Sequence, residues 1–338
     1  MRMDFANGPR IAAVIPHQKP ATGLCYHNDG VHLFASCEDD SRLYMINAQT
    51  GKCDSPAIRC ERDGIRLVSS THHDQCVLLA GKGSTDLPIS QRHSLNYMSV
   101  YDNKVLRKFR GHSDLVTKIS LSPADDTFLT SSKDRTVRLW NVQQAGCLGK
   151  MDLPKQTEGT PCSVFDSTGL VFAIMAGMAG GEGYHLHLYD ARNYSGGAFS
   201  ELKVTKADIE KAMATQRVSI PSGSSIMNWR TMQFNASGSR ILVESDPGIA
   251  IVLDGYESTV QRIFHTPKPT QQSSTVFTPD DKSVIMGADD GKLYCWDVEN
   301  GALLKTLEGH RGPIGALACN PKYAQIASSC SDTCLWLW

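Results

Sequence analysis

The feature that most constrains this chain is a strand-like segment that recurs along its length. Seven apolar, alternating runs end alike, and their aligned positions are 46, 101, 140, 189, 253, 296 and 338. Successive copies are therefore 55, 39, 49, 64, 43 and 42 residues apart. Alternation of apolar and polar residues indicates β-strands. A period near 40–45 residues indicates an array of similar four-stranded units.

A second spacing repeats together with the first. A Gly-His pair lies 28 residues before two of the aligned tryptophans, an Asp lies six before them, and a Ser or Thr lies four before that Asp. The complete sets are His112, Thr130, Asp134 and Trp140 in the third unit, and His310, Ser328, Asp332 and Trp338 in the seventh. An indole N–H can only donate, whereas imidazole and hydroxyl groups can also accept. Each set therefore predicts a buried structural network rather than a catalytic Ser-His-Asp group.

These spacings are typical of WD40 repeats and predict an all-β, seven-bladed β-propeller in a single domain. The expected blades are 17–60, 61–108, 109–153, 159–203, 226–266, 269–308 and 309–338. An insertion at 204–225 contains a short helical segment, Lys206–Arg217, which Thr205 and Asp208 would begin with a capping box. This helix would either dock on the side of the propeller or contact a partner.

The seventh copy supplies three strands up to Trp338, so its sheet needs a fourth. The segment Arg10–Ile15 is strand-like, and His17 lies 29 residues before Ile46, close to the spacing of the Gly-His pairs. We therefore expect residues 10–15 to pair with the last blade and close the ring. An unpaired strand edge there would invite aggregation.

Composition excludes several classes of function. The net charge is −1, from 34 basic and 35 acidic residues, so it favours neither direct nucleic-acid binding nor a membrane surface. The 11 cysteines form no Cys-x-x-Cys pair and read as core residues of a soluble intracellular protein. The dense histidines, His72-His73 and His185-x-His187, lack ligand partners at suitable spacing. We expect no metal, cofactor, small-molecule substrate or enzymatic activity.

Blade-specific pieces of the chain resemble the Swd2-type WD-repeat proteins. They include Asp102–Ser113 with Ser122–Phe128 and Lys133–Trp140, then Pro161–Asp166 and Leu188–Arg192. They continue with Phe277–Asp281, Asp290–Trp296, Asn320–Lys322 and Ala327–Ser331, so the similarity covers nearly the whole chain. The 204–227 insertion, a longer second-blade loop and the degenerate first blade depart from the usual pattern.

The resemblance implies a non-catalytic nuclear adaptor. Swd2-type proteins are shared subunits of a Set1/COMPASS-type histone methyltransferase complex and of a protein phosphatase-1 complex with a PNUTS-type scaffold, which acts in transcription termination. In some lineages they serve the mRNA cleavage and polyadenylation factors. The resemblance leaves open which assembly this chain joins.

A propeller binds through variable loops on a rigid scaffold. Alignment of the blades predicts that partners are bound by Asp39, Asp63, Leu115, Thr117, Lys133, Asn228, Trp229, Arg230, Gln271, Asp289 and Ser331. Trp229 and Arg230 are of the types that dominate binding energy at interfaces. An extended segment of a scaffold protein would lie across these residues or along a blade edge.

A second function stays open. Tyr189-Asp190-Ala-Arg192 resembles the Trp-Asp-x-Arg box of substrate receptors for cullin-type ubiquitin ligases, with Tyr in place of Trp. The same residues can equally be the ordinary end of a strand in the fourth blade.

Overall fold

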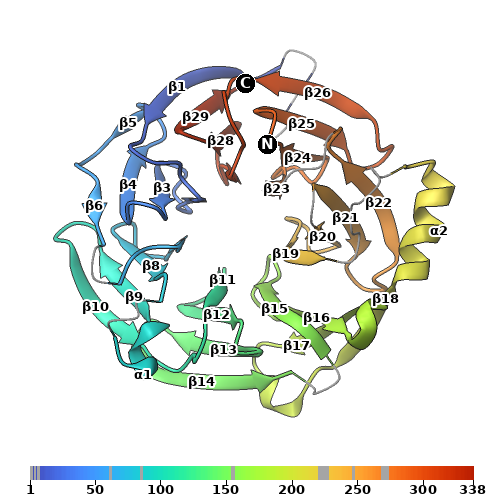
Figure 1. Cartoon of the computed structure of the whole chain (residues 1–338), viewed down its shortest axis with the longest axis horizontal. Coiled ribbons are helices and arrows are strands. Elements are labelled where there is room, and N and C mark those ends of the chain that lie inside the picture. The colour runs from blue at the N-terminus through green and yellow to red at the C-terminus, as the bar shows by residue number, and fades with distance from the viewer. Residues whose placement is uncertain are drawn as a thin grey trace. The chain divides into compact units, whose positions relative to one another are not determined.

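The fold is a seven-bladed β-propeller built from seven antiparallel sheets (Figure 1). The structure is a computed structural model, and it describes residues 3, 5, 8–60, 63–83, 87–153, 157–219, 228–245, 248–267 and 274–338. Within these residues, six sheets have four strands and one has five.

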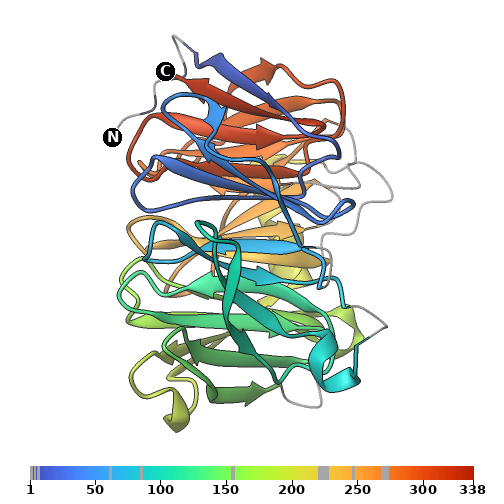
Figure 2. The same ribbon diagram turned by 90° about the vertical axis from the view of Figure 1, so that its left-hand side faces the viewer.

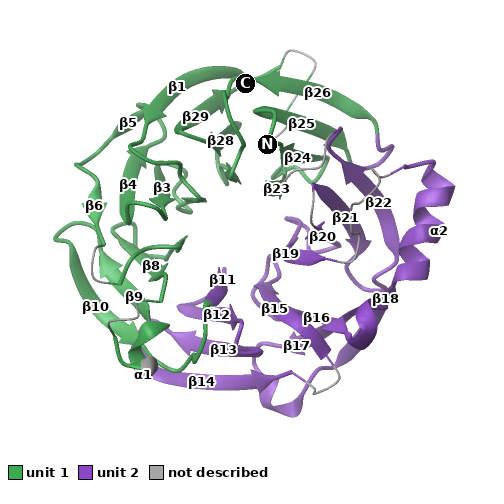
Figure 3. Cartoon of the chain, in the orientation of Figure 1, with its two compact units in different colours: residues 1–115, 272–297, 302–338 green, residues 116–271, 298–301 purple. Residues whose placement is uncertain are grey.

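The chain divides into two compact units (Figure 3). Unit 1 comprises residues 1–115, 272–297 and 302–338 and holds four of the sheets. Its first sheet contains β2 (Gly23–Tyr26), β3 (His32–Cys37), β4 (Arg42–Asn47), β5 (Lys52–Cys53) and β6 (Ile58–Arg59). The second contains β7 (Leu67–Ser70), β8 (Cys76–Ala80), β9 (Leu95–Ser99) and β10 (Lys104–Phe109), with the short helix α1 (Ile89–Arg92) between β8 and β9.

The other two sheets of unit 1 come from both ends of the chain. One contains β23 (Ser274–Phe277), β24 (Ser283–Gly287), β25 (Lys292–Asp297) and β26 (Leu303–Glu308). The last contains β27 (Ala316–Cys319), β28 (Gln325–Ser329) and β29 (Asp332–Leu337), and β1 (Arg10–Pro16) is its fourth strand.

Unit 2 comprises residues 116–271 and 298–301 and holds three sheets. They are β11 (Val116–Leu121), β12 (Thr127–Ser132), β13 (Thr136–Asn141) and β14 (Gln144–Asp152); β15 (Thr157–Phe165), β16 (Val171–Met178), β17 (Gly183–Asp190) and β18 (Ser200–Thr205); and β19 (Trp229–Phe234), β20 (Arg240–Ser245), β21 (Ile249–Asp254) and β22 (Val260–His265). The 3-10 turns η1 (Ala179–Gly181) and η2 (Tyr194–Gly196) and the helix α2 (Lys206–Gln216) complete the unit.

The predicted pairing of the N-terminal strand with the seventh blade is confirmed. Strand β1 runs antiparallel to β29, with Arg10 opposite Leu337 and Pro16 opposite Asp332 (Figures 1 and 2). Ile15 is buried in a cluster with Leu335, because that face of β1 packs on the blade. The pairing removes the exposed edge that β29 would otherwise present.

Helix α2 docks on the edge of the fifth blade. It begins with the predicted capping box, in which Thr205 and Asp208 exchange hydrogen bonds. Ile209 is buried in the unit 2 core. The Gln216 amide donates to the Gln261 carbonyl and accepts from the Ile263 N–H, so it satisfies backbone groups of the outer strand β22. No described helix is long and apolar enough to span a bilayer.

Candidate functional site

Four of the predicted binding residues occupy equivalent turns between the second and third strands of their blades. Asp39 follows β3, Lys133 follows β12, Asp289 follows β24 and Ser331 follows β28. Asp39, Lys133 and Ser331 are exposed, whereas Asp289 is half-buried. These short turns are held by the hairpins on both sides, so their side chains project from a rigid frame.

Two further candidates lie on β-bulges. The pairing of β11 with β12 shifts register between Val116 and Lys118, at Thr117, and that of β19 with β20 shifts between Trp229 and Thr231, at Arg230. A bulge turns the extra residue away from the ladder. Arg230 is exposed as a result, whereas Thr117 is half-buried and its hydroxyl donates to the Ser131 carbonyl.

The neighbours of these two residues differ in accessibility. Asn228, directly before β19, is exposed, and Leu115, directly before β11, is half-buried. In unit 2 the exposed candidates are therefore Lys133, Asn228 and Arg230.

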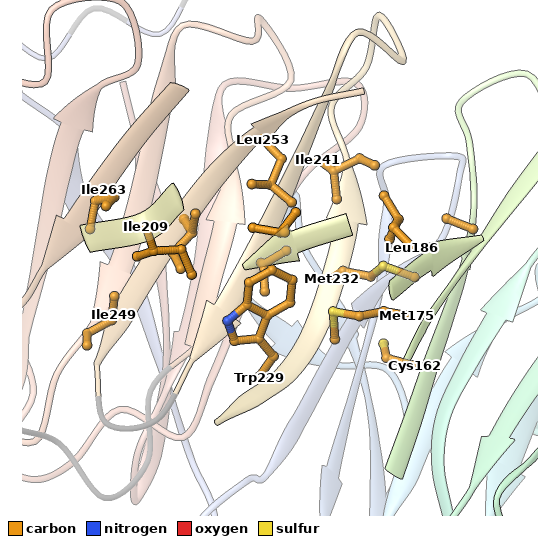
Figure 4. Close-up of a cluster of buried hydrophobic side chains, with 14 of the residues drawn as sticks. Cys162, Met175, Leu186, Ile209, Trp229, Met232, Ile241, Ile249, Leu253 and Ile263 are labelled. Atoms are coloured by element: carbon orange, nitrogen blue, oxygen red, sulfur yellow. The ribbon is translucent and has the colours of Figure 1, made fainter. Parts of the chain in front are cut away.

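The expectation that Trp229 offers its ring to a partner is wrong. Its side chain is 5% exposed and stacks on Tyr184, with ring centroids 4.1 Å apart and planes 2° apart. Figure 4 shows the indole among Met232, Ile249 and other apolar side chains of the unit 2 core. The bulge lies at Arg230, which is exposed, and the preceding residue Trp229 is buried on the inward side of the strand.

Asp63 is engaged inside its own blade. Its Oδ2 atom lies 2.7 Å from Nζ of Lys108 and accepts a hydrogen bond from the Asn96 amide at 3.0 Å. The side chain is 14% exposed and lines a cavity of about 370 Å³ with Leu79 and Met98. This arrangement makes Asp63 part of a structural pair, so it is a poor candidate for partner contact. Gln271 lies outside the described residues.

The Tyr-Asp-Ala-Arg segment lies at the end of β17 and just beyond it. Tyr189 is half-buried and stacks on Phe172, with centroids 5.0 Å apart. Asp190 accepts the Arg192 N–H at 2.8 Å. Asp190 and Arg192 line a cavity of about 500 Å³ with the exposed side chain of Phe199.

In the third blade, a hydrogen bond joins two members of the predicted set. Trp140 donates its indole N–H to the Thr130 hydroxyl at 2.8 Å, and both side chains are fully buried. Trp140 lies opposite Phe128 in the ladder, two residues before Thr130.

In the seventh blade, the assignment of Trp338 to this network is wrong. Trp336 donates to the Ser328 hydroxyl at 2.7 Å, and Nε2 of His310 lies 2.6 Å from the same oxygen. Trp336 is opposite Ile326, which matches Trp140 opposite Phe128. Trp338 instead packs edge-on against Phe5, with ring centroids 5.2 Å apart.

The shift arises because the β28–β29 turn is two residues shorter than the β12–β13 turn. Three residues separate Ser329 from its partner Thr333, whereas five separate Ser131 from Val137. The sulfur of Cys330 lies 3.0 Å from Nδ1 of His310. The Asp332 side chain accepts from the Ser331 hydroxyl.

Comparison with known proteins agrees with this geometry. The family model "WD domain, G-beta repeat" matches residues 103–141 and 301–338, which include the two networks. The chain is 31% identical to Protein ANTHESIS POMOTING FACTOR 1 of Arabidopsis thaliana over 320 residues, covering 92% of this chain and 86% of that protein.

Two further relatives are similar in extent. WD repeat-containing protein 82 of Drosophila melanogaster is 29% identical over 313 residues, with 91% of this chain and 87% of the relative covered. COMPASS component SWD2 of Saccharomyces cerevisiae is 24% identical over 325 residues, with 92% and 88% covered. The chain is a divergent member of the Swd2-type family of WD-repeat proteins.

Burial in this Swd2-type propeller lowers the pKa of two blade histidines. Desolvation lowers the pKa of His17 to about 4, although Asp332 and Asp40 act in the opposite direction. Nε2 of His17 lies 2.7 Å from the Thr333 hydroxyl, and the ring meets Tyr44 edge-on at 4.4 Å. Burial also lowers the pKa of His310, and Asp332 opposes that shift.

The lowered pKa of His17 predicts that the Swd2-type fold loses stability in mild acid. Between its unfolded pKa of 6.5 and its folded pKa of about 4, the unfolded chain binds a proton that the folded chain excludes. For His17 alone, the free energy of unfolding should fall by about 2 kcal/mol from about pH 7.5 to about pH 5. Urea unfolding of His17→Asn at both pH values should show a loss smaller by this amount. His73→Asn, at an exposed position, should behave as the wild type, and an equal loss in His17→Asn would contradict the prediction.

Proposed function

We propose that this chain is a non-catalytic adaptor subunit of a nuclear, Set1/COMPASS-type histone methyltransferase complex. The observation that carries the proposal is similarity over most of both chains to COMPASS component SWD2. A relative matched across 88% of its length shares the scaffold on which its binding loops are built. The role in this chain is to present those loops, since a propeller holds them in fixed positions.

Under the same proposal, the chain is shared with a phosphatase complex. A PNUTS-type scaffold with protein phosphatase-1, acting in transcription termination, is the second assembly implied by the family resemblance, and cleavage and polyadenylation factors are the third. Each requires a docked protein segment, so the exposed turn and bulge residues serve all three.

We place the contact in unit 2 at Lys133, Asn228 and Arg230, which are exposed on a turn and beside or on a bulge. Arg is enriched among residues that dominate binding energy, because its planar guanidinium makes several hydrogen bonds at once. Two cationic side chains favour a partner segment that carries carboxylates or exposed backbone carbonyls.

The prediction is that Lys133→Ala with Arg230→Ala weakens partner binding by more than about 10-fold, since each such residue contributes about 1–2 kcal/mol or more. Affinity purification of the tagged full chain followed by mass spectrometry measures the loss. The matched control is Lys150→Ala with Lys203→Ala, which removes the same charge from the strands β14 and β18. Unchanged recovery of partners from the Lys133/Arg230 variant would refute the placement.

The identity of the recovered proteins tests the function itself. A Set1-type methyltransferase supports the leading proposal, and a phosphatase-1 catalytic subunit with its scaffold supports the second assembly. Neither outcome depends on whether the contact lies at Lys133 and Arg230.

A second candidate function is that of substrate receptor for a cullin-type ubiquitin ligase. The observation that favours it is that Arg192 is exposed and lines a cavity together with Asp190 and Phe199. Recovery of a cullin adaptor that is lost in Arg192→Ala would support this function. Recovery of a methyltransferase that is unaffected by Arg192→Ala would reject it.

A further inference from the structure

The turn between β2 and β3 brings together three side chains that can bind a metal ion. They are His27, Asp29 and His32, and their potential ligand atoms all lie within 4.8 Å of one another. Nδ1 of His27 lies 3.0 Å from Oδ2 of Asp29, and Nδ1 of His32 lies 2.5 Å from the same oxygen. The expectation of no metal ligands considered the histidine pairs at 72–73 and 185–187, whereas the turn gathers residues two, three and five positions apart.

The carboxylate of Asp29 is held in place by the backbone of its own turn. Its Oδ1 atom accepts the Val31 N–H at 2.7 Å and the His32 N–H at 3.0 Å. These bonds occupy one carboxylate oxygen and direct the other toward the two imidazoles. Fixed orientation of a ligand by outer hydrogen bonds is characteristic of metal sites.

The imidazole of His27 lies beside this carboxylate. Its Nδ1 lies 3.0 Å from Oδ2 of Asp29 and 3.2 Å from the Asp29 backbone nitrogen. The His27 side chain is only 7% exposed, so this ring nitrogen is held close to the carboxylate inside the turn.

The second blade also has histidines, His72 and His73, in its β7–β8 turn, but five other blades build the same turn without them. In each, the first residue donates its N–H to the carbonyl of the sixth, as His27 does to His32 at 2.9 Å. The corresponding pairs are Ser122–Thr127, Asp166–Val171, Asn235–Arg240, Thr278–Ser283 and Asn320–Gln325. Their first residues accept turn N–H groups through a hydroxyl, a carboxylate or an amide. The turn therefore forms without imidazoles, and its geometry alone does not explain two of them around one carboxylate.

We propose that His27, Asp29 and His32 form a zinc site. Two imidazoles and a carboxylate are ligands that Zn²⁺ prefers, and zinc bound by three protein ligands keeps a fourth position for solvent. Tetrahedral ligand atoms at about 2.0–2.1 Å from zinc lie about 3.4 Å apart. Coordination of zinc through Nδ1 requires each imidazole to carry its proton on Nε2.

The surroundings of the site allow an ion to enter without unfolding the turn. The side chains of Asp29 and His32 are 28% and 25% exposed, so one side of the site is open. The Asn320 amide donates to the Gly30 carbonyl at 2.7 Å and anchors the loop to the seventh blade from behind.

Cobalt(II) is the probe that tests the site, because its visible spectrum reports the ligands and it occupies zinc sites. The full chain, kept reduced and free of metal, should bind one Co²⁺ with the visible bands of a four-coordinate nitrogen–oxygen site. It should show no thiolate-to-cobalt charge transfer in the near ultraviolet. Zn²⁺ should displace the cobalt. His32→Gln should weaken binding by more than about 100-fold, since even residues behind the ligands contribute about 10- to 100-fold.

A matched control separates this site from the other histidines and from the cysteines. His72→Gln with His73→Gln, at two exposed positions, should bind Co²⁺ as the wild type does. The unfolding temperature of metal-free His32→Gln should equal that of the metal-free wild type, whereas Zn²⁺ should raise only that of the wild type. Unchanged binding by His32→Gln, a spectrum with thiolate bands, or no binding by the folded wild type would overturn the proposal.

Discussion

Replacing Ile15 with Ala is expected to lower the free energy of unfolding by about 2–5 kcal/mol, the usual cost of truncating a buried Ile. Ile15 is 4% exposed and belongs to a cluster with Leu33, Ile46 and Leu335. The substitution leaves a cavity where β1 packs on its blade, so the strand loses the apolar contact that holds it in register. Urea or thermal unfolding of the full chain measures the change.

Val14→Ala is the matched control for this substitution. Val14 is adjacent in the same strand but points to the other side and is 54% exposed. Its truncation should cost within about 0.5 kcal/mol, as expected for a surface position. Deletion of residues 1–15 should be more damaging than Ile15→Ala, because it also removes most of the backbone pairing with β29. If the deleted chain unfolds at the same temperature as the full chain, β1 does not stabilise the seventh blade.

The number and kind of blades could be predicted from the sequence because two local rules coincide. Alternating apolar residues specify strands, and a turn Asp at fixed distance from a Trp specifies a hairpin. The pairing of residues 10–15 with the last blade followed from counting, since seven copies left one strand position unfilled. A capping box of two residues, Thr205 and Asp208, was sufficient to place the start of α2.

Accessibility at the candidate surface was harder to predict, because it depends on contacts between strands. Asn228, Trp229 and Arg230 are consecutive, and a bulge decides which of them faces outward. The stacking of Trp229 on Tyr184 joins residues 45 positions apart, and no local pattern reveals it. The His27, Asp29 and His32 set did have a local signal, the spacing His-x-Asp-x-x-His across a turn between two strands.

The seventh blade shows a limit of spacing arguments. Trp338 lies just beyond the end of β29, two residues after Trp336, and both tryptophans pack against the same apolar cluster. Counting back from Trp338 reproduces the distances of the third blade, yet the shorter turn puts Trp336 in the structural position. A two-residue change of turn length preserves the alternation of faces, and only the hydrogen-bond partners reveal it.

The hydrogen bond of Trp336 predicts a difference between two otherwise similar substitutions. Trp336→Phe removes the donor to Ser328 and should lower the free energy of unfolding by about 1–3 kcal/mol, and Trp336→Ala by about 3–5 kcal/mol. Trp338→Phe should cost less than about 0.5 kcal/mol, because its ring is only half-buried and has no bond to Ser328 to lose. Equilibrium unfolding in urea compares the variants.

A double-mutant cycle then assigns the effect to the bond itself. Ser328→Ala removes the acceptor, so adding Trp336→Phe to it should cost at least about 0.5 kcal/mol less than Trp336→Phe alone. Combining Ser328→Ala with Trp338→Phe should instead give additive costs, since those side chains share no hydrogen bond. A larger cost for Trp338→Phe than for Trp336→Phe would contradict the assignment of Trp336 to this network. It would instead support Trp338, the residue indicated by the 28-residue spacing, and a β28–β29 turn as long as the β12–β13 turn.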